Sequence, residues 1–517
     1  MHWADVIADE LIKSCDKPLI ATGISPTGII HVGSLREAIT GESVRSAVEA
    51  KGASARLIYL IDSYDPLRRR YEFLPESFEE YPGMPISDIP CPCGKHDNYA
   101  HHFIQPFLDA AESLNVKCEI IWTHELYRQG KFEKAVDLCL RNHEEIARIL
   151  REVSGKDEGK GSPPYNPRCE RCGRFAAPVL ETYSYPTVEY RCKCGHRGVD
   201  DIREGKGKLQ WRLEWPAKWL IFGTSAEPFG KDHASAGGSY DSGKRIAREI
   251  YGIEPPYPIP YEFVQLKEGK SRKQMHKSAG GSVSGVEALG MLPPEVLNYF
   301  FLRVNPGRAI DFDSELGVLD LADEYDRMER AYFSGDFTEA EEGGVRAYEI
   351  AQHNRVPASL PFQVPCRHLV NVVQMSDSFE GAMEVIGRTE DLSKASPEDL
   401  ERLRRRMDCV RYWLDGFAPE SVKFKVHPQM PEGLSLSAEE KAFFKDLSGR
   451  VGGMEWNPES IGSAISEAGK ASPIGSKGAY KAIYSVLIGK ASGPRLGPFL
   501  AGMDRAFVEE RLRRASE

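Results

Sequence analysis

The chain has 517 residues, of which 41% are hydrophobic and 28% charged, and its formal net charge is −10. This length predicts two to four domains, because a single hydrophobic core stops growing well below it. The composition is that of a soluble globular protein, and no apolar run reaches the roughly 18–20 residues of a membrane-spanning helix, so no membrane partner is expected. The acidic balance argues against a non-specific nucleic-acid binder but leaves a selective one open.

The predicted elements begin as an alternation of helix and strand. Apolar spacing predicts an amphipathic helix over residues 1–16, and Leu19–Thr22 is a short strand. A helix follows from His31 to about Ala50, and residues 55–62 are a buried strand because their apolar run is nearly continuous. Strand, glycine-rich loop, helix and strand make a βαβ unit, which predicts an α/β fold with a parallel, Rossmann-type sheet.

The amino-acid composition changes in the middle of the chain. Turn-forming residues and cysteines recur across 83–205, around a helical stretch at 103–153 and a strand candidate at Cys118–Trp122. We interpret 83–205 as an insertion into the α/β domain. The α/β pattern then returns, with a helix starting near Ser242. From about residue 320 onward helical periodicity dominates, which predicts an all-α C-terminal domain.

Two groups of cysteines and histidines have the spacing of metal ligands. The first is C-x2-C followed by C-x-C, formed by Cys169, Cys172, Cys192 and Cys194. Four thiols in two close pairs favour tetrahedral zinc over free thiols in a loop. The second group is Cys91, Cys93, His96 and His102, with His101 or Asp88 as substitutes, and its alternative is a solvated surface loop. Four protein ligands leave no open position, so one or two structural zinc ions are expected.

The location of the protein is predicted from its cysteines and its first residues. Acids stand near the start, at Asp5, Asp9 and Glu10, where a signal peptide would carry basic residues. Eleven cysteines, an odd number, favour a reducing compartment. We therefore expect the cytoplasm.

Four stretches indicate a nucleotide site. His31 and Gly33 open a helix directly after a strand, where free backbone N–H groups and the helix dipole bind phosphate. Residues 229–243 place a Lys-Asp-His before a glycine pair, 268–282 are basic and glycine-rich, and 211–219 supply three tryptophans around one acid. Each stretch alone has an ordinary structural explanation, so their order along the chain is the informative feature.

These stretches resemble a known family. "PTGIIHVGS" is similar to the HIGH signature of class I aminoacyl-tRNA synthetases, and "QMHKS" at 274–278 is similar to their KMSKS signature. The archaeal-type class I lysyl-tRNA synthetases are the closer resemblance, which covers most of the chain through "DPLRRR", "EWPAKW", "FGKDHASAGGSYDSG", "YEFVQLK" and "LIGKASGPRLGPF". The chain departs from the two signatures at Ser34, Gln274 and His276.

The resemblance implies an enzyme that activates L-lysine with ATP and Mg²⁺ and transfers it to the 2′-hydroxyl of the terminal adenosine of tRNA(Lys). It implies a Rossmann-type catalytic domain with a zinc-binding insertion, followed by an all-α anticodon-binding domain, a helix cage. The domains are then 1–82 with 206–265 (catalytic), 83–205 (zinc-binding insertion), 266–325 (KMSKS-loop and stem-contact region) and 326–517 (anticodon-binding).

The resemblance also assigns roles to individual residues. The catalytic residues would be His31, Gly33 and Lys277, with Lys277 neutralising the leaving pyrophosphate. ATP would contact Pro26, Thr27, His31, Gly33, Ser34, Asp232, His233, Gly237, Gly238, Lys273, Met275, Lys277 and Ser278. Lysine would contact Gly23, Ser25, Trp211, His233 and Tyr261. Which acid pairs with the lysine ammonium stays open.

The C-terminal helices would bind the tRNA. Basic residues interleaved with aromatic ones suit phosphate contacts and base stacking. The candidates are Arg402, Arg405, Arg406, Trp413, Lys490 and Arg495. A monomer is expected, with other synthetases as candidate partners. Three alternatives stay open: glutamyl- or glutaminyl-type specificity, a small-molecule nucleotidyltransferase, and a non-catalytic, zinc-dependent RNA-binding protein.

Overall fold

A computed structural model describes residues 1–155, 163–175, 179–268, 271–274 and 283–517. The chain divides into two compact units. The first, the α/β unit, comprises Met1–Leu289, Pro294–Phe312 and Asp336–Val356, and the second, the helical unit, comprises Gly290–Pro293, Asp313–Gly335 and Pro357–Glu517. None of the described helices is both long and apolar enough to cross a membrane. The domain boundaries expected from the sequence stay predictions.

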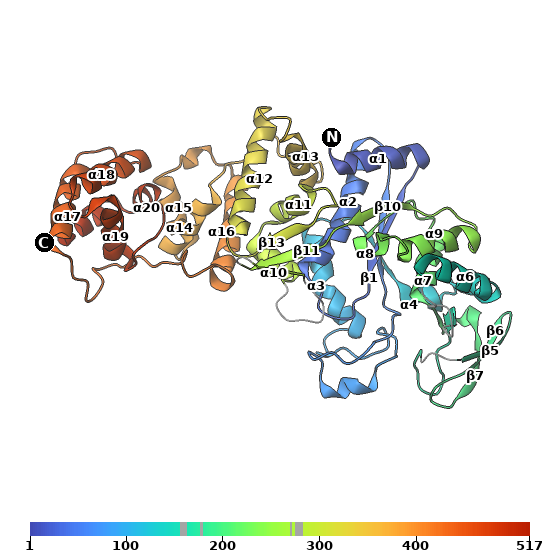
Figure 1. Ribbon diagram of the computed structural model, residues 1–517. Coiled ribbons are helices and arrows are strands. Elements are labelled where there is room, and N and C mark those ends of the chain that lie inside the picture. Colours follow the sequence, from blue (N-terminus) through green and yellow to red (C-terminus); the bar gives the residue numbers. More distant parts are fainter. Residues whose placement is uncertain (156–162, 176–178, 269–270, 275–282) are drawn as a thin grey trace. The chain divides into compact units, whose positions relative to one another are not determined.

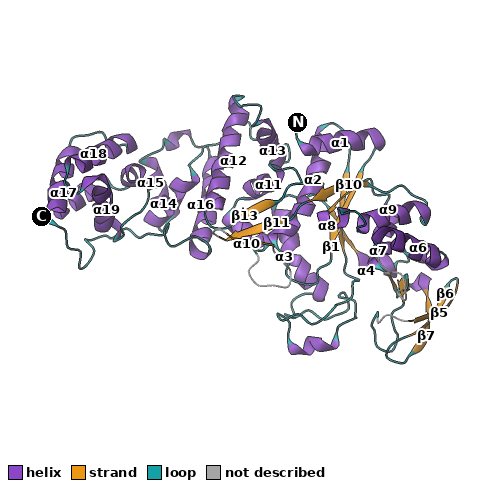
Figure 2. Cartoon of the chain, viewed as in Figure 1, coloured by secondary structure: helices purple, strands orange, loops and turns teal. Residues whose placement is uncertain are grey.

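A five-stranded parallel sheet is the centre of the α/β unit (Figures 1 and 2). Its order is β10-β9-β1-β2-β3, and its strands are β1 (Leu19–Ile24), β2 (Arg56–Ile61), β3 (Glu119–Trp122), β9 (Ala226–Gly230) and β10 (Tyr257–Tyr261). The chain runs outward from β1 through β2 to β3 and then returns to the other side of β1. The strand order therefore reverses between β1 and β9, the place where such sheets bind ligands at the carboxyl ends of their strands.

Helices cover this sheet. They are α1 (Trp3–Ser14), α2 (Leu35–Ala50), α7 (Trp211–Phe222), α8 (Lys231–Ala234) and α9 (Ser239–Glu249), and a short 3-10 turn, Val32–Ser34, precedes α2. Helix α2 is buried along most of its length between α1 and the sheet. At Gly41 an added Cβ would lie 2.9 Å from Leu57 Cδ1, so the glycine lets α2 approach the sheet closely.

The segment between β2 and β9 combines helices with small antiparallel sheets. Apart from α7, its helices are a 3-10 turn (Glu76–Glu80), α3 (Tyr99–Ser113), α4 (Thr123–Arg128), α5 (Glu133–Arg141), α6 (His143–Ser154) and a 3-10 turn (Ile202–Glu204). Its strands, apart from β3, are β4 (Tyr165–Asn166), β5 (Val179–Ser184), β6 (Thr187–Arg191), β7 (Arg197–Asp201) and β8 (Lys208–Leu209). Strand β3 pairs with β2, so the segment 83–205 supplies one strand of the parallel sheet.

After β10 the chain forms another small sheet and three more helices, which lie wholly or mostly in the α/β unit. The sheet has the order β12-β11-β13, with β11 (Val264–Glu268), β12 (Ser271–Gln274) and β13 (Ile310–Asp313). The helices are α10 (Gly285–Met291), α11 (Pro294–Leu302) and α13 (Glu342–Ala351). Arg36 of α2 is buried and donates to the carbonyls of Glu262 and Arg308, which ties α2 to the residues just before β11 and β13.

The helical unit consists mainly of α-helices, as the sequence predicts for the C-terminal part (Figure 2). They are α12 (Gly317–Ser334), α14 (Cys366–Met375), α15 (Phe379–Gly387), α16 (Pro397–Gly416), α17 (Ala438–Val451), α18 (Pro458–Ala471), α19 (Gly475–Ile488), α20 (Leu496–Gly502) and α21 (Arg505–Ala515), with a 3-10 turn at Leu392–Lys394. Ser396 and Ser437 begin α16 and α17 with capping boxes, which satisfy backbone N–H groups at each helix start. Phe443, Phe444 and Phe499 lie in the buried core of α17–α21.

Candidate active site

A cavity of about 560 Å³ lies at the carboxyl ends of β1 and β9, at the reversal of strand order. Nine residues singled out from the sequence line it: Gly23, Ser25, His31, Gly33, Ser34, Trp211, Asp232, His233 and Tyr261. Pro26, Thr27, Gly237 and Gly238 do not belong to its lining. Met275, Lys277 and Ser278 lie outside the described residues, and Lys273 lies on β12, of which the backbone alone is described.

The His31–Gly33 loop is held by backbone hydrogen bonds. Val32 N donates to Val283 O at 2.7 Å, and Ser34 N donates to His31 O at 2.9 Å. The His31 ring lies against Gly33, where an added Cβ would be 2.9 Å from the ring's Nδ1. Glycine two residues after the histidine therefore leaves room for the imidazole at the rim of the cavity.

Glu37 is a cavity acid that the sequence analysis did not single out. It lies in the first turn of α2, and its carboxylate accepts hydrogen bonds from Gly23 N at 2.9 Å, from Tyr261 OH at 2.5 Å and from the Thr22 hydroxyl. Burial raises the pKa of Glu37, and these three hydrogen bonds oppose the rise. An acid in the first turn of a helix is ordinary, because it complements the helix dipole, so the sequence carries no signal for this role.

Glu227 is a second acid of the cavity that was missed. It lies on β9, is 7% exposed, and accepts hydrogen bonds from the indole N–H groups of Trp215, at 2.8 Å, and Trp219. Burial raises the pKa of Glu227 to about 8, because the enclosed carboxylate loses its hydration. The tryptophan-rich stretch 211–219 thus orients an acid as well as providing aromatic surface.

Three other acids of the cavity are paired with lysines. Asp62 pairs with Lys218, and Lys208 pairs with Glu214 and, at 3.2 Å, with Asp65. Burial raises the pKa of Asp62 to about 6 against the opposing charge of Lys218. Glu37 and Glu227 differ from these acids. In the described part of the chain they accept hydrogen bonds from neutral backbone, hydroxyl and indole groups.

The protonation of Glu227 predicts a pH-dependent stability. The folded chain keeps this proton up to a pH of about 8, whereas an unfolded glutamate releases it near 4.5. The free energy of unfolding therefore falls with rising pH between these values, by about 1.4 kcal/mol per pH unit. Because glutamine does not titrate, we expect the stability difference between Glu227→Gln and wild type to grow in favour of the variant from pH 6 to pH 8.

Urea unfolding of both proteins at the two pH values measures this difference. Glu254→Gln is the matched control, since its side chain is 79% exposed and its difference from wild type should not change with pH. A Glu227→Gln difference that is equal at pH 6 and pH 8 would show that Glu227 is already ionised in the folded chain.

The first metal-ligand group is assembled around a common centre. The Sγ atoms of Cys169 and Cys194 are 3.6 Å apart and those of Cys172 and Cys192 are 3.7 Å apart, and all four lie within 4.8 Å of one another. Thiolates at the corners of a zinc tetrahedron are about 3.8 Å apart, given Zn–S bonds of about 2.3 Å. The structure therefore fits the zinc site expected from the sequence.

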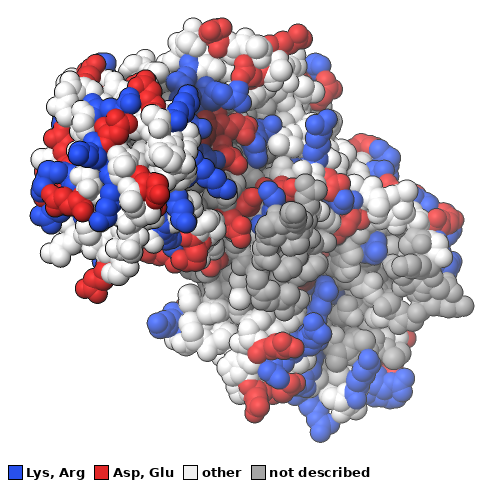
Figure 3. Space-filling model, turned by 60° about the vertical axis from the view of Figure 1, so that its left-hand side comes forward, with Lys and Arg blue, Asp and Glu red and all other residues white. Residues whose placement is uncertain are grey.

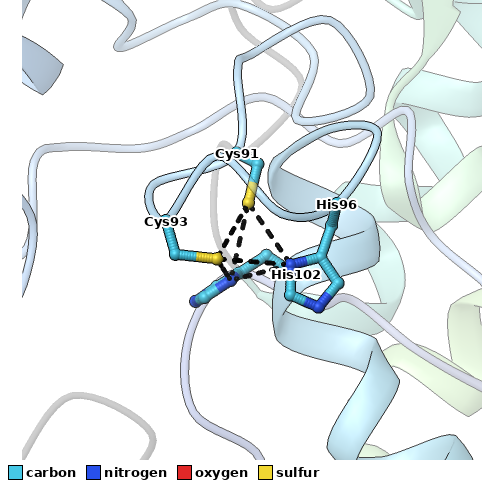
Figure 4. Close-up of side chains that lie close together, drawn as sticks. All are labelled: Cys91, Cys93, His96 and His102. Carbon is cyan, nitrogen blue, oxygen red and sulfur yellow. Dashed lines mark hydrogen bonds between the residues drawn. The ribbon is translucent and has the colours of Figure 1, made fainter.

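The second group is also brought together (Figure 4). All six distances among the Sγ atoms of Cys91 and Cys93 and the Nδ1 atoms of His96 and His102 lie between 3.3 and 3.6 Å. Such equal edges describe a tetrahedron of the size that zinc needs with two sulfur and two nitrogen ligands. The suggested substitutes are engaged elsewhere. His101 stacks on Trp122, with ring centroids 4.0 Å apart, and Asp88 pairs with two arginines.

Removal of one thiol should release one ion. We expect Cys169→Ser to contain one zinc fewer per chain than wild type and to become protease-sensitive between β4 and β8, because a tetrahedral site loses closure with one ligand. Metal analysis and limited proteolysis measure this, with Cys15→Ser, outside both groups, as the control. Wild-type protein with less than about one zinc per chain would contradict the assignment.

Three of the six side chains expected to bind RNA form contacts inside the helical unit. Arg402 pairs with Glu329 at 3.0 Å, and Arg406 pairs with Asp326, both in buried surroundings. Trp413 is 1% exposed and donates to Ser314 O at 3.0 Å. These side chains stabilise the contact between α16 and the segment around α12. Their role in RNA binding stays a prediction, and RNA could reach them only by breaking these buried ion pairs and the hydrogen bond of Trp413.

The other three expected RNA contacts are exposed: Arg405, Lys490 and Arg495. Arg495 also lines a cavity of about 730 Å³ within the helical unit. Basic and acidic side chains are interspersed on the visible face of this unit (Figure 3).

The fold and the site together define a class I aminoacyl-tRNA synthetase, with the histidine–glycine loop at the reversal point of a parallel sheet. The chain belongs to the family of tRNA synthetases class I (K), which it matches over residues 1–354. As a member of this family the chain is a ligase, and ATP is implied as a substrate. The nucleotidyltransferase and the non-catalytic RNA-binding alternatives are thereby set aside.

Named relatives resemble the chain along its whole length. Lysine–tRNA ligase of Thermoplasma acidophilum is 40% identical over 522 residues, covering 99% of this chain and 98% of that protein. Lysine–tRNA ligase 1 of Methanosarcina acetivorans is 41% identical over 542 residues, covering 100% and 98%. A glutamate–tRNA ligase structure from Elizabethkingia meningosepticum has 12% identity and a TM-score of 0.42, covering 96% of this chain and 99% of that one.

Proposed function

We propose that this synthetase activates L-lysine with ATP to form lysyl-adenylate and transfers the lysyl group to the 2′-hydroxyl of the terminal adenosine of tRNA(Lys). The observation that carries the proposal is Glu37, a buried carboxylate with neutral hydrogen-bond donors beside the His31–Gly33 loop. The relatives of this chain that are named lysine–tRNA ligase also favour lysine as the substrate amino acid.

The charges of the cavity favour a cationic substrate. A buried carboxylate without a cationic partner is costly, and the ε-ammonium of lysine would supply that partner at Glu37. Trp211 and His233, whose ring centroids are 5.8 Å apart, add π faces suited to a cation. Arg212, the arginine considered for a glutamate pocket, packs over Trp211 and does not belong to the cavity lining, in which Arg68 is the arginine.

The chain's own groups would act by positioning and by neutralising charge. The lysine carboxylate is the nucleophile, so no activated serine or cysteine is required. His31, with Gly33 leaving room at the rim, would donate to the ATP phosphates, and Lys277 would neutralise the departing pyrophosphate. Magnesium would enter with the ATP and neutralise phosphate charge. The two cysteine-rich groups would hold structural zinc.

The helical unit would contact the tRNA. Arg405, Lys490 and Arg495 are the exposed basic candidates that remain from the sequence, and they suit phosphate contacts with an RNA loop. A cytoplasmic location, a monomeric state and association with other synthetases stay predictions.

ATP–pyrophosphate exchange across the twenty amino acids, with and without tRNA(Lys), tests the proposed specificity. We expect lysine to be the amino acid that supports exchange. Exchange driven by glutamate or glutamine instead would replace the proposal with the alternative left open by the sequence.

A further inference from the structure

A stripe of three tryptophans runs along α7 beside the cavity. Trp211, Trp215 and Trp219 are spaced four residues apart, so they share one face of the helix. Their exposure falls along the stripe: Trp211 is 45% exposed, Trp215 is half-buried and Trp219 is 1% exposed. Trp211 and Trp215 line the cavity, whereas Trp219 lies in the core. The stripe therefore leads from the cavity into the core of the α/β unit.

Glu227 holds the two inner tryptophans. Its carboxylate oxygens accept separate hydrogen bonds, one from Trp215 Nε1 at 2.8 Å and one from Trp219 Nε1. Glu227 lies on β9 and is 7% exposed, so water has little access to these bonds. Phe229, two residues further along β9, packs edge-to-face against Trp215, with ring centroids 5.3 Å apart. The indole of Trp215 is therefore fixed to the sheet.

The fixed indole of Trp215 supports His233. The two ring centroids are 5.4 Å apart, and Trp211 contacts the same imidazole with centroids 5.8 Å apart. The polar contacts of His233 are longer than a well-formed hydrogen bond: 3.4 Å from Nδ1 to Ser239 Oγ and 3.8 Å from Nε2 to Asp232 Oδ2. Because Trp211 is exposed, packing against Trp215 does most to fix the imidazole.

We propose that Glu227 is a positioning residue for the amino-acid site: it holds the Trp215 indole and, through that ring, fixes the place of His233. This inference rests on the proposed function, in which Trp211 and His233 provide the aromatic surface for the substrate side chain. The role differs from that of Glu37, whose carboxylate would meet the ammonium itself. Loss of the Glu227 acceptors would let the Trp215 indole turn, and His233 would lose the position in which it contacts the substrate.

The test is ATP–pyrophosphate exchange with lysine, in the presence of tRNA(Lys), by Glu227→Met, with Glu254→Met as the matched control. Methionine keeps an unbranched side chain of similar size and offers only a weak acceptor to the indoles. Glu254 is 79% exposed, so its variant should behave as wild type. We expect Glu227→Met to raise KM for lysine about tenfold and to leave kcat within about threefold of wild type. A loss of folded enzyme would instead lower kcat and leave KM unchanged.

Two backgrounds test the path from Glu227 to His233. Trp215→Phe keeps an aromatic ring beside His233 but removes the N–H, so adding Glu227→Met should raise KM for lysine less than about twofold. Trp219→Phe removes the other hydrogen bond of Glu227 and leaves the Trp215 bond in place. Adding Glu227→Met to this background should therefore still raise KM for lysine at least about fivefold.

A KM for lysine within about twofold of wild type in Glu227→Met, or an equal effect of this change with and without the Trp215 N–H, would overturn the inference. The second result would show that Glu227 meets the substrate ammonium directly. If Glu227→Met does not fold alone, the comparison in the Trp219→Phe background, where one N–H fewer is left unpaired, is judged by the same criteria. A wild-type enzyme without lysine-dependent exchange would instead refute the proposed function, so the two failures are distinguishable.

Discussion

Glu37→Gln is expected to lower kcat/KM for lysine in the exchange reaction by about 10²–10³-fold, mainly through KM. Glutamine keeps the shape of the side chain: its carbonyl oxygen can still accept from Gly23 N, and its amide N–H can donate to the Tyr261 hydroxyl oxygen. It removes the negative charge that would face the lysine ammonium, and breaking a buried pair by removing one partner costs about 3–5 kcal/mol. The loss should therefore appear in lysine binding, with KM for ATP nearly unchanged.

Glu49→Gln is the matched control on the same helix. Its side chain is 48% exposed at the far end of α2, so its kinetics should equal those of wild type. A Glu37→Gln enzyme that binds lysine as well as wild type would show that another acid, with Glu227 the first candidate, provides the charge. The two single variants compared side by side identify which carboxylate carries recognition.

Lys277→Ala is expected to slow activation by about 10²–10³-fold while leaving lysine affinity nearly unchanged. By its resemblance to the KMSKS signature, this lysine is proposed to meet the negative charge that develops on the departing pyrophosphate. A cation that meets the charge in the transition state contributes to kcat rather than to substrate binding. Single-turnover formation of adenylate, with lysine binding measured in parallel, separates the two quantities.

Lys270→Ala is the control for this prediction, because it removes a charge from the same basic stretch outside the signature. Its activation rate should stay within a few-fold of wild type. If both variants lose activity equally, the stretch acts through its overall charge and Lys277 has no special role.

The sequence predicted three of the five strands of the parallel sheet and was silent on the other two. Strands β1 and β2 were expected because their apolar runs are continuous, and β3 was a strand candidate. Strands β9, AEPFG, and β10, YPIPY, carry prolines and an acid, which are poor strand signals. Proline is tolerated in β10 because this strand lies at the sheet edge, where one side needs no ladder hydrogen bonds.

The site shows a similar division. Signatures such as His31–Gly33 are local, so they could be recognised in the sequence. The surroundings of Glu37 and Glu227 depend instead on hydrogen-bond partners 224 and 12 residues away. The RNA candidates show the limit of periodicity. Arg402 and Arg406 are four residues apart and therefore share a helix face. This face is buried because it packs against α12, which supplies their acidic partners.

Charging of tRNA(Lys) with radiolabelled lysine tests the central claim most directly. Transcripts ending in adenosine, in 2′-deoxyadenosine or in 3′-deoxyadenosine are offered to the enzyme with ATP and either lysine or glutamate. We predict lysine-dependent charging of the adenosine and 3′-deoxyadenosine transcripts and none of the 2′-deoxyadenosine transcript. Charging with glutamate, or lysine charging that survives loss of the 2′-hydroxyl, would contradict the account.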